Sequence, residues 1–286
     1  MAVRTAVVNE RRRRGAGCAL YGFYVTERQV DLGLKGKVAV VTGATAGIGL
    51  AAALKFVEEG ARVAICARSA DKLAATVELL RAKGGDVFGL ATDISRPEEI
   101  ERFFTAVAGH FGRIDILVNN AGTSMRGPFL KVSDADWDAD LELKLYGAIR
   151  CSRLAVQHMK KQGGGRIVNI STIGGKQPAA TSMPTSVSRA AGLALTKALS
   201  REFAADNILV NAVCIGKIKA GQHERAAATK GRDADDLYRE FAQDIPLGRV
   251  GEAEEAANVI VFLASGAASY VTGSSVNLDG GASSVM

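Results

Sequence analysis

A glycine-rich turn between a short apolar run and a segment of helical period constrains this chain more than any other feature. The apolar run is Val38–Thr42, and the turn reads Thr42-Gly43-Ala44-Thr45-Ala46-Gly47-Ile48-Gly49-Leu50. Glycines here permit a tight turn, a close approach of backbone N–H groups to phosphate oxygens and close packing of helix on strand. The helix N-terminus adds partial positive charge. The turn therefore predicts a site for the pyrophosphate of a dinucleotide, with Gly43, Thr45, Ala46, Gly47, Ile48 and Gly49 as its residues.

Elsewhere the chain alternates between short β-rich runs and segments of helical period. Such alternation predicts an α/β fold with a parallel sheet covered by helices on both faces. Right-handed crossovers then give a single-domain, doubly wound sheet of the Rossmann type with about seven strands. The predicted strands are Val38–Thr42, Arg62–Cys66, Val87–Thr92, Ile114–Asn119, Arg166–Ser171, Leu209–Cys214 and Ser275–Leu278. The predicted helices are Gly49–Glu59, Asp71–Lys83, Glu98–Phe111, Asp134–Lys161, Ser186–Ala205 and Glu252–Ser265.

One long connection, Lys217–Leu247, breaks this alternation. Long segments at the carboxyl edge of a parallel sheet commonly cover a ligand, so we favour a lid over a solvated helical excursion. His223 lies in this segment and is a less favoured candidate for a proton donor, because loop histidines are more often exposed and idle.

Composition fits one large domain in a reducing environment. The chain has 286 residues, of which 48% are apolar, and its four cysteines lie far apart with no Cys-x-x-Cys pair. These features allow one sizeable core and favour neither a disulfide framework nor a metal site. The sequence contains no apolar run near the roughly 20 residues that span a bilayer, and its start lacks the apolar core of a secretory signal. We expect a soluble, cytoplasmic protein.

The positive charge is concentrated near the start of the chain. Residues 1–35 contain seven Lys or Arg against three Asp or Glu, a net +4, which leaves +2 of the total +6 for residues 36–286. The run Arg11-Arg12-Arg13-Arg14 has no helical or strand period, so we expect a basic, disordered N-terminal extension over residues 1–35. A targeting segment, a polyanion-binding arm, sequence upstream of the real start and disorder without function all remain open. Binding of nucleic acid has little support, because the charge of the body is ordinary.

The end of the second predicted strand indicates which dinucleotide binds. An acidic residue there would hold a ribose 2′-hydroxyl, but the sequence reads Ala67-Arg68. A guanidinium can pair with a 2′-phosphate and stack on adenine, so Arg68 favours NADP(H) over NAD(H). The alternative is a surface arginine in a turn, since the glycine loop contains no second basic residue.

Further motifs follow in order along the chain. They are Asp93-Ile94, Asn119-Asn120-Ala121-Gly122, Ile245-Pro246-Leu247-Gly248-Arg249 and Leu278-Asp279-Gly280-Gly281. Together with the glycine turn they resemble the short-chain dehydrogenase/reductase family over residues 36–286, and the chain looks most like a 3-oxoacyl-carrier-protein reductase. The resemblance implies oxidoreductase activity on a small carbonyl or alcohol. It also implies a homodimer or homotetramer formed through Asp134–Lys161, Ser186–Ala205 and the C-terminal strand. It assigns cofactor contacts to Asp93, Ile94, Asn120, Ala121, Gly122 and Ile218.

The residues that the family uses for proton transfer are replaced here. Family members have a tyrosine, a lysine four residues later, a serine on the preceding strand and an asparagine on the preceding helix. Matching the chain to that pattern gives Thr185, Arg189, Thr172 and Lys144 at these four positions. The resemblance therefore implies a divergent active site that lacks the Tyr-x-x-x-Lys motif.

These four residues predict different chemistry. The hydroxyl of Thr172 can hold a carbonyl oxygen, whereas the aliphatic hydroxyl of Thr185 cannot replace a phenol as a proton donor. Arg189 can hold ribose hydroxyls or polarise an oxygen, but it stays charged. Lys144 beside Arg189 predicts a strongly cationic pocket that binds an anionic or enolisable substrate and lowers the pKa of the lysine.

Two functions follow from this pattern. The leading one is an NADP(H)-dependent oxidoreductase, in which Thr172 and Arg189 hold the reacting oxygen and Lys144 or a water handles the proton. The other is a catalytically silent NAD(P)-binding sensor or scaffold. Lys217 and Lys219 predict a basic substrate entrance, which favours an anionic or carrier-bound substrate.

Overall fold

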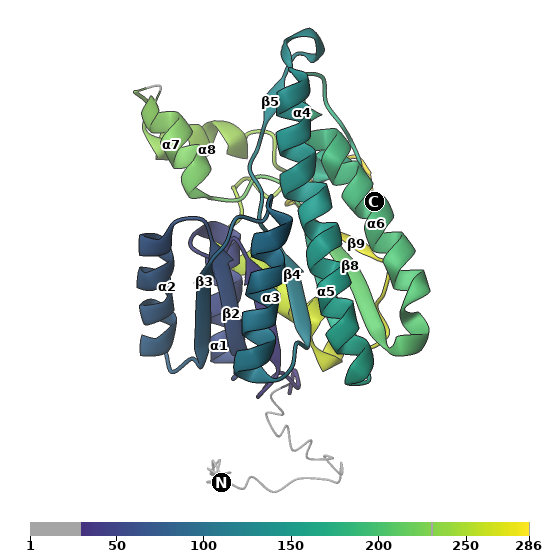
Figure 1. The fold of residues 1–286 in the computed structure, drawn as a ribbon. Helices are drawn as coiled ribbons and strands as arrows, with labels where there is room; N and C mark the ends of the chain where they lie inside the picture. The colour runs from purple at the N-terminus through teal and green to yellow at the C-terminus, as the bar shows by residue number, and fades with distance from the viewer. Residues whose placement is uncertain (1–29, 230, 286) are drawn as a thin grey trace, which may run out of the picture. The chain divides into compact units, whose positions relative to one another are not determined.

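A computed structural model of the chain describes residues 30–229 and 231–285. From Leu32 onward the described residues belong to one compact unit (Figure 1). Only the last six residues of the predicted N-terminal extension, 30–35, are among them, so the arginine run at 11–14 lies outside the described residues. No helix in the described part of the chain combines the length and apolar character that a membrane span requires.

Seven parallel strands form the central sheet, in the order β3-β2-β1-β4-β6-β8-β9. Their order reverses between β1 and β4, and at such a point a crevice opens at the carboxyl ends of the strands. This sheet confirms the predicted fold class. The strands are β1 (Val38–Thr42), β2 (Arg62–Ala67), β3 (Val87–Ala91), β4 (Ile116–Asn119), β6 (Gly165–Thr172), β8 (Ile208–Ile215) and β9 (Ser275–Leu278).

Alternating apolar side chains on the strands build a core on each face of the sheet. In β1, Ala39 and Val41 belong to the core on one face, and Val38 and Val40 to the core on the other. Helices α1 and α9 cover the first face, and α3 and α5 cover the second (Figure 1). The helices on the sheet are α1 (Gly47–Glu58), α2 (Ala70–Ala82), α3 (Pro97–Phe111), α5 (Gly147–Lys161), α6 (Thr185–Glu202) and α9 (Ala253–Ala264).

The predicted helix Asp134–Lys161 is interrupted by a π-helical segment. It divides into α4 (Asp134–Leu141), the π segment η2 (Glu142–Tyr146) and α5. Segments of this kind are often found at functional sites, and this one contains Lys144. The prediction of an unbroken helix was wrong because one wide turn barely changes the spacing of apolar residues.

Several short elements were not predicted, because two or three residues carry no periodic pattern. Strands β5 (Arg126–Gly127) and β7 (Met183–Pro184) form an antiparallel pair. Single 3₁₀ turns are η1 (Phe129–Lys131), η3 (Ile173–Gly175), η4 (Ala204–Asp206) and η5 (Gly266–Ala268).

The long connection after β8 contains two helices, α7 (Gly221–Thr229) and α8 (Ala234–Ala242). They lie side by side in Figure 1. A small apolar cluster of Tyr238, Ile245 and Val250 attaches this segment to the chain that follows it.

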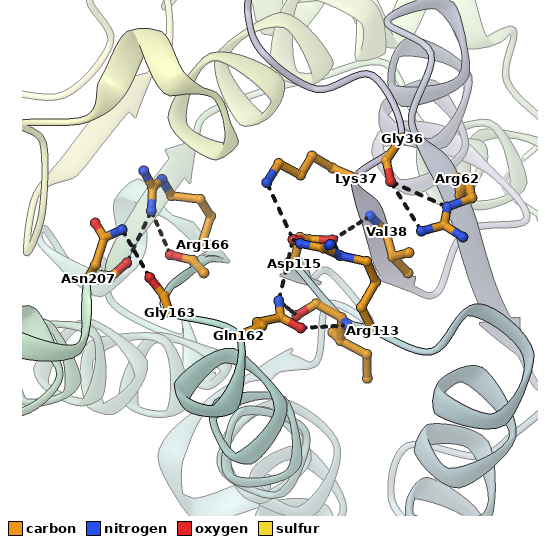
Figure 2. A network of polar contacts seen from close by, with 12 residues as sticks. Gly36, Lys37, Val38, Arg62, Arg113, Asp115, Gln162, Gly163, Arg166 and Asn207 are labelled. Carbon is orange, nitrogen blue, oxygen red and sulfur yellow. Dashed lines mark hydrogen bonds and ion pairs between the residues drawn. The ribbon is translucent and has the colours of Figure 1, made fainter.

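A polar network ties several segments together at the amino end of the sheet (Figure 2). Its centre is the buried side chain of Asp115, whose Oδ2 accepts hydrogen bonds from the backbone N–H of Val38 at 2.9 Å and from Nε of Arg113 at 2.8 Å. Lys37 Nζ lies 3.6 Å from Oδ1, and Gln162 Nε2 donates to the same oxygen at 3.3 Å. Burial raises the pKa of Asp115, but these hydrogen bonds and the charges of Arg113 and Lys37 hold it below its usual value.

Candidate active site

A cleft of about 1140 Å³ opens at the carboxyl ends of the strands. It is lined by residues that directly follow β1, β2, β3 and β4 and by the ends of β6 and β8. The structure brings together in this cleft all the residues predicted to contact the cofactor except Gly49. They are Gly43, Thr45, Ala46, Gly47, Ile48, Arg68, Asp93, Ile94, Asn120, Ala121, Gly122, Arg189 and Ile218.

The glycine turn is locked against the end of β4. Asn120 Nδ2 donates to the carbonyl oxygens of Thr42 at 2.9 Å and Gly43 at 3.0 Å. A Cβ added to Gly49 would lie 2.4 Å from that amide nitrogen, and one on Gly43 would lie 2.9 Å from the Cα of Ala121. The predicted close packing of helix on strand is here a close packing of α1 on the loops after β1 and β4, and Gly49 does not line the cleft.

The end of the cleft next to β2 contains two basic residues. Arg68 and Lys72 both line it, with Ser69 between them. Ser69 caps α2, its Oγ accepting from the backbone N–H of Lys72 at 3.4 Å. Two cations at a helix N-terminus suit a phosphate. Sequence reasoning missed Lys72 because it searched the glycine loop for a second basic residue and not the first turn of the following helix.

The guanidinium of Arg189 reaches the cleft between β6 and Gly122. Its Nη1 donates to the carbonyl oxygen of Ile170 at 2.6 Å, and Nη2 lies 2.6 Å from the position that a Cβ on Gly122 would take. Its Nε is buried and has no hydrogen-bond partner among the described residues. Burial lowers the pKa of Arg189 to about 10, although the charges of Asp140 and Cys214 oppose this shift. Thr172 lines the same part of the cleft.

A buried polar network lies beside Arg189. Lys144 Nζ donates to Oδ1 of Asp140 and, at 2.7 Å, to Oγ1 of Thr185. Ser188 Oγ donates to Oδ2 of Asp140 at 2.5 Å. Asp140, which sequence reasoning missed, therefore joins α4, the π segment and α6. Its spacing of four residues from Lys144 was a usable signal, because such residues share a helix face.

The hydroxyl of Thr185 has all its hydrogen-bonding positions occupied by protein groups. It accepts from Lys144 and from the backbone N–H of Met125 at 3.0 Å, and it donates to the carbonyl oxygen of Met125 at 2.6 Å. A hydroxyl has one proton and two lone pairs. Although Thr185 lines the cleft, its hydroxyl has no capacity left for a substrate oxygen in this arrangement.

Lys144 does not line the main cleft. It borders a separate cavity of about 20 Å³, room for about one water, together with Asn119, Asn169, Ser171 and Arg189. Burial, together with the charge of Arg189, lowers the pKa of Lys144 to about 8, against the opposing effect of Asp140. The direction of this shift is the predicted one, but its largest cause is burial and not the charge of Arg189. The predicted strongly cationic pocket does not fit the structure, because the carboxylate of Asp140 offsets one of the two cations.

The part of the cleft between β5 and the loop after β8 contains two cations, but one of them differs from the predicted pair. Lys217 lines it, but Lys219 does not, since its Nζ pairs with Glu252 at 2.5 Å. Arg126 of β5 lines the cleft instead. Both ends of the Lys217–Leu247 segment border the cleft, as a lid requires. His223 lies in α7, and its side chain is outside the described part of the structure.

Comparisons with known proteins agree with this fold and site. The family described as enoyl-(acyl carrier protein) reductase matches residues 43–283. An uncharacterized oxidoreductase of Thermotoga maritima is 38% identical, over 89% of this chain and its own full length. A 3-oxoacyl-[acyl-carrier-protein] reductase of Staphylococcus epidermidis is 35% identical, over 86% of this chain and 98% of its own.

Solved structures give the same result. The L-sorbose reductase of Gluconobacter frateurii, in complex with NADPH and L-sorbose, has a TM-score of 0.87 at 36% identity. The match covers 90% of this chain and all of that one. The chain therefore belongs to the short-chain dehydrogenase/reductase family of oxidoreductases.

Proposed function

We propose that this protein is an NADP(H)-dependent oxidoreductase that reduces a carbonyl group or oxidises an alcohol at a divergent active site. The observation that carries the proposal is the continuity of one cleft, which joins the glycine turn and Arg68 to Thr172 and Arg189. Arg68 and Lys72 line the same end of the cleft, and two cations there support binding of a 2′-phosphate, and so of NADP(H) over NAD(H). The NADPH in the L-sorbose reductase structure supports the same choice.

The residues of the cleft suit a dinucleotide. Backbone N–H groups of the turn Gly43–Ile48 would hold the pyrophosphate, Asp93 and Ile94 the adenine, and Ile218 the nicotinamide amide. The guanidinium of Arg189, which lines the cleft, would donate to a ribose or substrate oxygen. A nicotinamide bound here would supply or accept hydride.

The protein's own part in the chemistry is to hold the reacting oxygen. Thr172 Oγ1 and the guanidinium of Arg189 border the cleft and can both donate to it. The hydroxyl of Thr185 is used internally and Lys144 lies behind it, so we propose that water in the cleft delivers the proton. Because no side chain that the structure describes is positioned as a general acid, we expect turnover to be about 10²–10⁴-fold slower than in an enzyme that has one.

The test is a titration of the protein with NADPH and NADH, followed by nicotinamide fluorescence, and then a carbonyl panel watched for NADPH consumption. We expect tighter binding of NADPH, and the variants Arg68→Gln and Lys72→Gln should each weaken NADPH binding about tenfold while leaving NADH binding nearly unchanged. Equal losses for both cofactors would contradict the 2′-phosphate site. Turnover of any carbonyl would establish the enzyme.

The network around Asp140 favours a second candidate, a catalytically silent NAD(P)-binding sensor or scaffold. Thr185 and Lys144 stand at positions of the family's proton-transfer residues, yet both are hydrogen-bonded inside the protein. NADPH binding without turnover across the carbonyl panel would favour this candidate over the enzyme.

Two further proposals concern the assembly and the surroundings of the protein. A homodimer or homotetramer through α5 and α6 is supported by exposed apolar side chains beside and on these helices, Tyr146 at 46% and Val187 at 44%. A cytoplasmic location is supported by Cys66, Cys151 and Cys214, which are free, buried thiols. Sedimentation would test the assembly.

A further inference from the structure

Two cations that line the cleft between β5 and the loop after β8 have no part in the chemistry proposed above. Arg126 comes from β5 and Lys217 from the loop after β8, and both line the cleft. Phe241 and Asp244, at the end of α8 and just beyond it, line it with them. Lys217 Nζ lies 4.0 Å from the centroid of the Phe241 ring, which holds the ammonium by a cation–π contact.

Neither cation is held in a side-chain ion pair within the described residues, although Asp244 lies near enough to act on Lys217. Within residues 30–229 and 231–285, no hydrogen bond or ion pair is formed by the side chain of Arg126 or Lys217, whereas nearby Lys219 pairs with Glu252. Burial, and then the charge of Arg126, lower the pKa of Lys217, and Asp244 opposes this. Lys217 is half-buried and Arg126 is exposed. Like charges held near each other repel, and an anion that binds between them removes that repulsion.

The charges also indicate which kind of anion would fit. Arg126 and Lys217 contribute two positive charges and Asp244 one negative charge, so the site carries a net charge of about +1. A single carboxylate would balance it, whereas a phosphate with a charge near −2 would leave an excess and lie close to Asp244. The planar guanidinium of Arg126 matches the two oxygens of a carboxylate.

Both cations are anchored close to the residues that border the reacting oxygen. In the pairing of β6 with β8, Thr172 lies opposite Ile215. Lys217 is two residues farther along the chain, so its Cα is at most about 7 Å from the Cα of Ile215. Arg126 lies opposite Pro184, the residue before Thr185. Both side chains therefore extend from backbone next to the elements that carry Thr172 and Thr185, and they line the same cleft as Thr172 and Arg189.

We propose that Arg126 and Lys217 bind the carboxylate of the substrate, which is a short keto acid or the corresponding hydroxy acid. The proposal rests on the proposed function, because it places the keto oxygen at Thr172 and Arg189. In the reduction the carbonyl carbon gains a hydride, its oxygen gains a proton, and the carboxylate is unchanged.

Kinetics on matched substrates test the proposal. The probes are short 2-, 3- and 4-keto acids, each beside its methyl ester. For at least one pair we expect kcat/KM to be at least about tenfold higher for the acid. The variants Arg126→Gln and Lys217→Gln should each raise KM for the acid by about tenfold and leave the ester unchanged. Lys217→Arg should retain most of the preference, and Lys219→Gln, which removes a paired lysine outside the cleft, should have no effect.

Calorimetry separates failure of this inference from failure of the proposed function. The same keto and hydroxy acids are titrated into the NADPH-loaded protein and into the Arg126→Gln/Lys217→Gln variant. Acid binding that this variant loses, with no turnover of any carbonyl, would support the carboxylate site while the enzyme proposal fails. Turnover of neutral ketones, with acids and esters affected alike by the variant, would overturn the site and leave the enzyme proposal standing. Preference for a phosphorylated ketone over every keto acid would also overturn the carboxylate site.

Discussion

At the scale of single residues, the buried pair of Asp140 and Lys144 decides which contacts the side chains of Lys144 and Thr185 can make. The side chains of Asp140 and Lys144 are 0% and 1% exposed, so removing one charge leaves the other buried without its partner. We expect Lys144→Met to lower the free energy of unfolding by about 3–5 kcal/mol, and Asp140→Asn in the same chain to restore most of that loss. Urea unfolding of the single and double variants measures this coupling. A Lys144→Met variant of unchanged stability that binds NADPH but has lost all turnover would instead show that Lys144 is a free acid acting on the substrate.

At the scale of elements, the sequence predicted best those strands and helices whose apolar pattern extends over several residues. All seven strands of the main sheet and the glycine turn could be predicted, because alternating apolar residues and a strand-to-helix turn are local signals. The π segment, the β5–β7 pair and the saturation of Thr185 could not, since they depend on contacts between segments far apart in the chain. Asp140 and Thr185 are 45 residues apart, and Met125 and Thr185 are 60 apart. Two residues were within reach of sequence reasoning: Lys72 by its place in the first turn of α2, and Asp140 by its helical spacing from Lys144.

The start of α1 gives a prediction at this scale. A Cβ on Gly49 would meet Asn120 Nδ2 at 2.4 Å and the carbonyl oxygen of Gly43 at 2.5 Å, whereas one on Gly109 in α3 would meet nothing within 4 Å. We expect Gly49→Ala to lower the free energy of unfolding by about 1–3 kcal/mol and to weaken NADPH binding, because the glycine turn must shift. The same change at Gly109 should raise stability by about 0.5–1 kcal/mol, since it removes a helical glycine. Similar effects of the two substitutions on thermal unfolding would show that the turn tolerates the added methyl group.

At the scale of the whole molecule, the candidate site and the Asp115 network lie at opposite ends of the sheet, so the two can be tested separately. Asp115 joins β1 through Val38 and the end of α5 through Gln162 (Figure 2). Its pKa is lowered in the folded protein, so its stabilisation is complete above the unfolded value near about 3.9 and is lost as pH falls through the folded value. We expect Asp115→Asn to lower the free energy of unfolding by about 2–3 kcal/mol at pH 7, and the difference from the unaltered protein to shrink as the pH falls below about 4. Urea unfolding across this pH range measures it, with NADPH affinity at pH 7 as the control that should not change. A difference that stays constant down to pH 3 would mean that Asp115 acts through its shape and not through its charge.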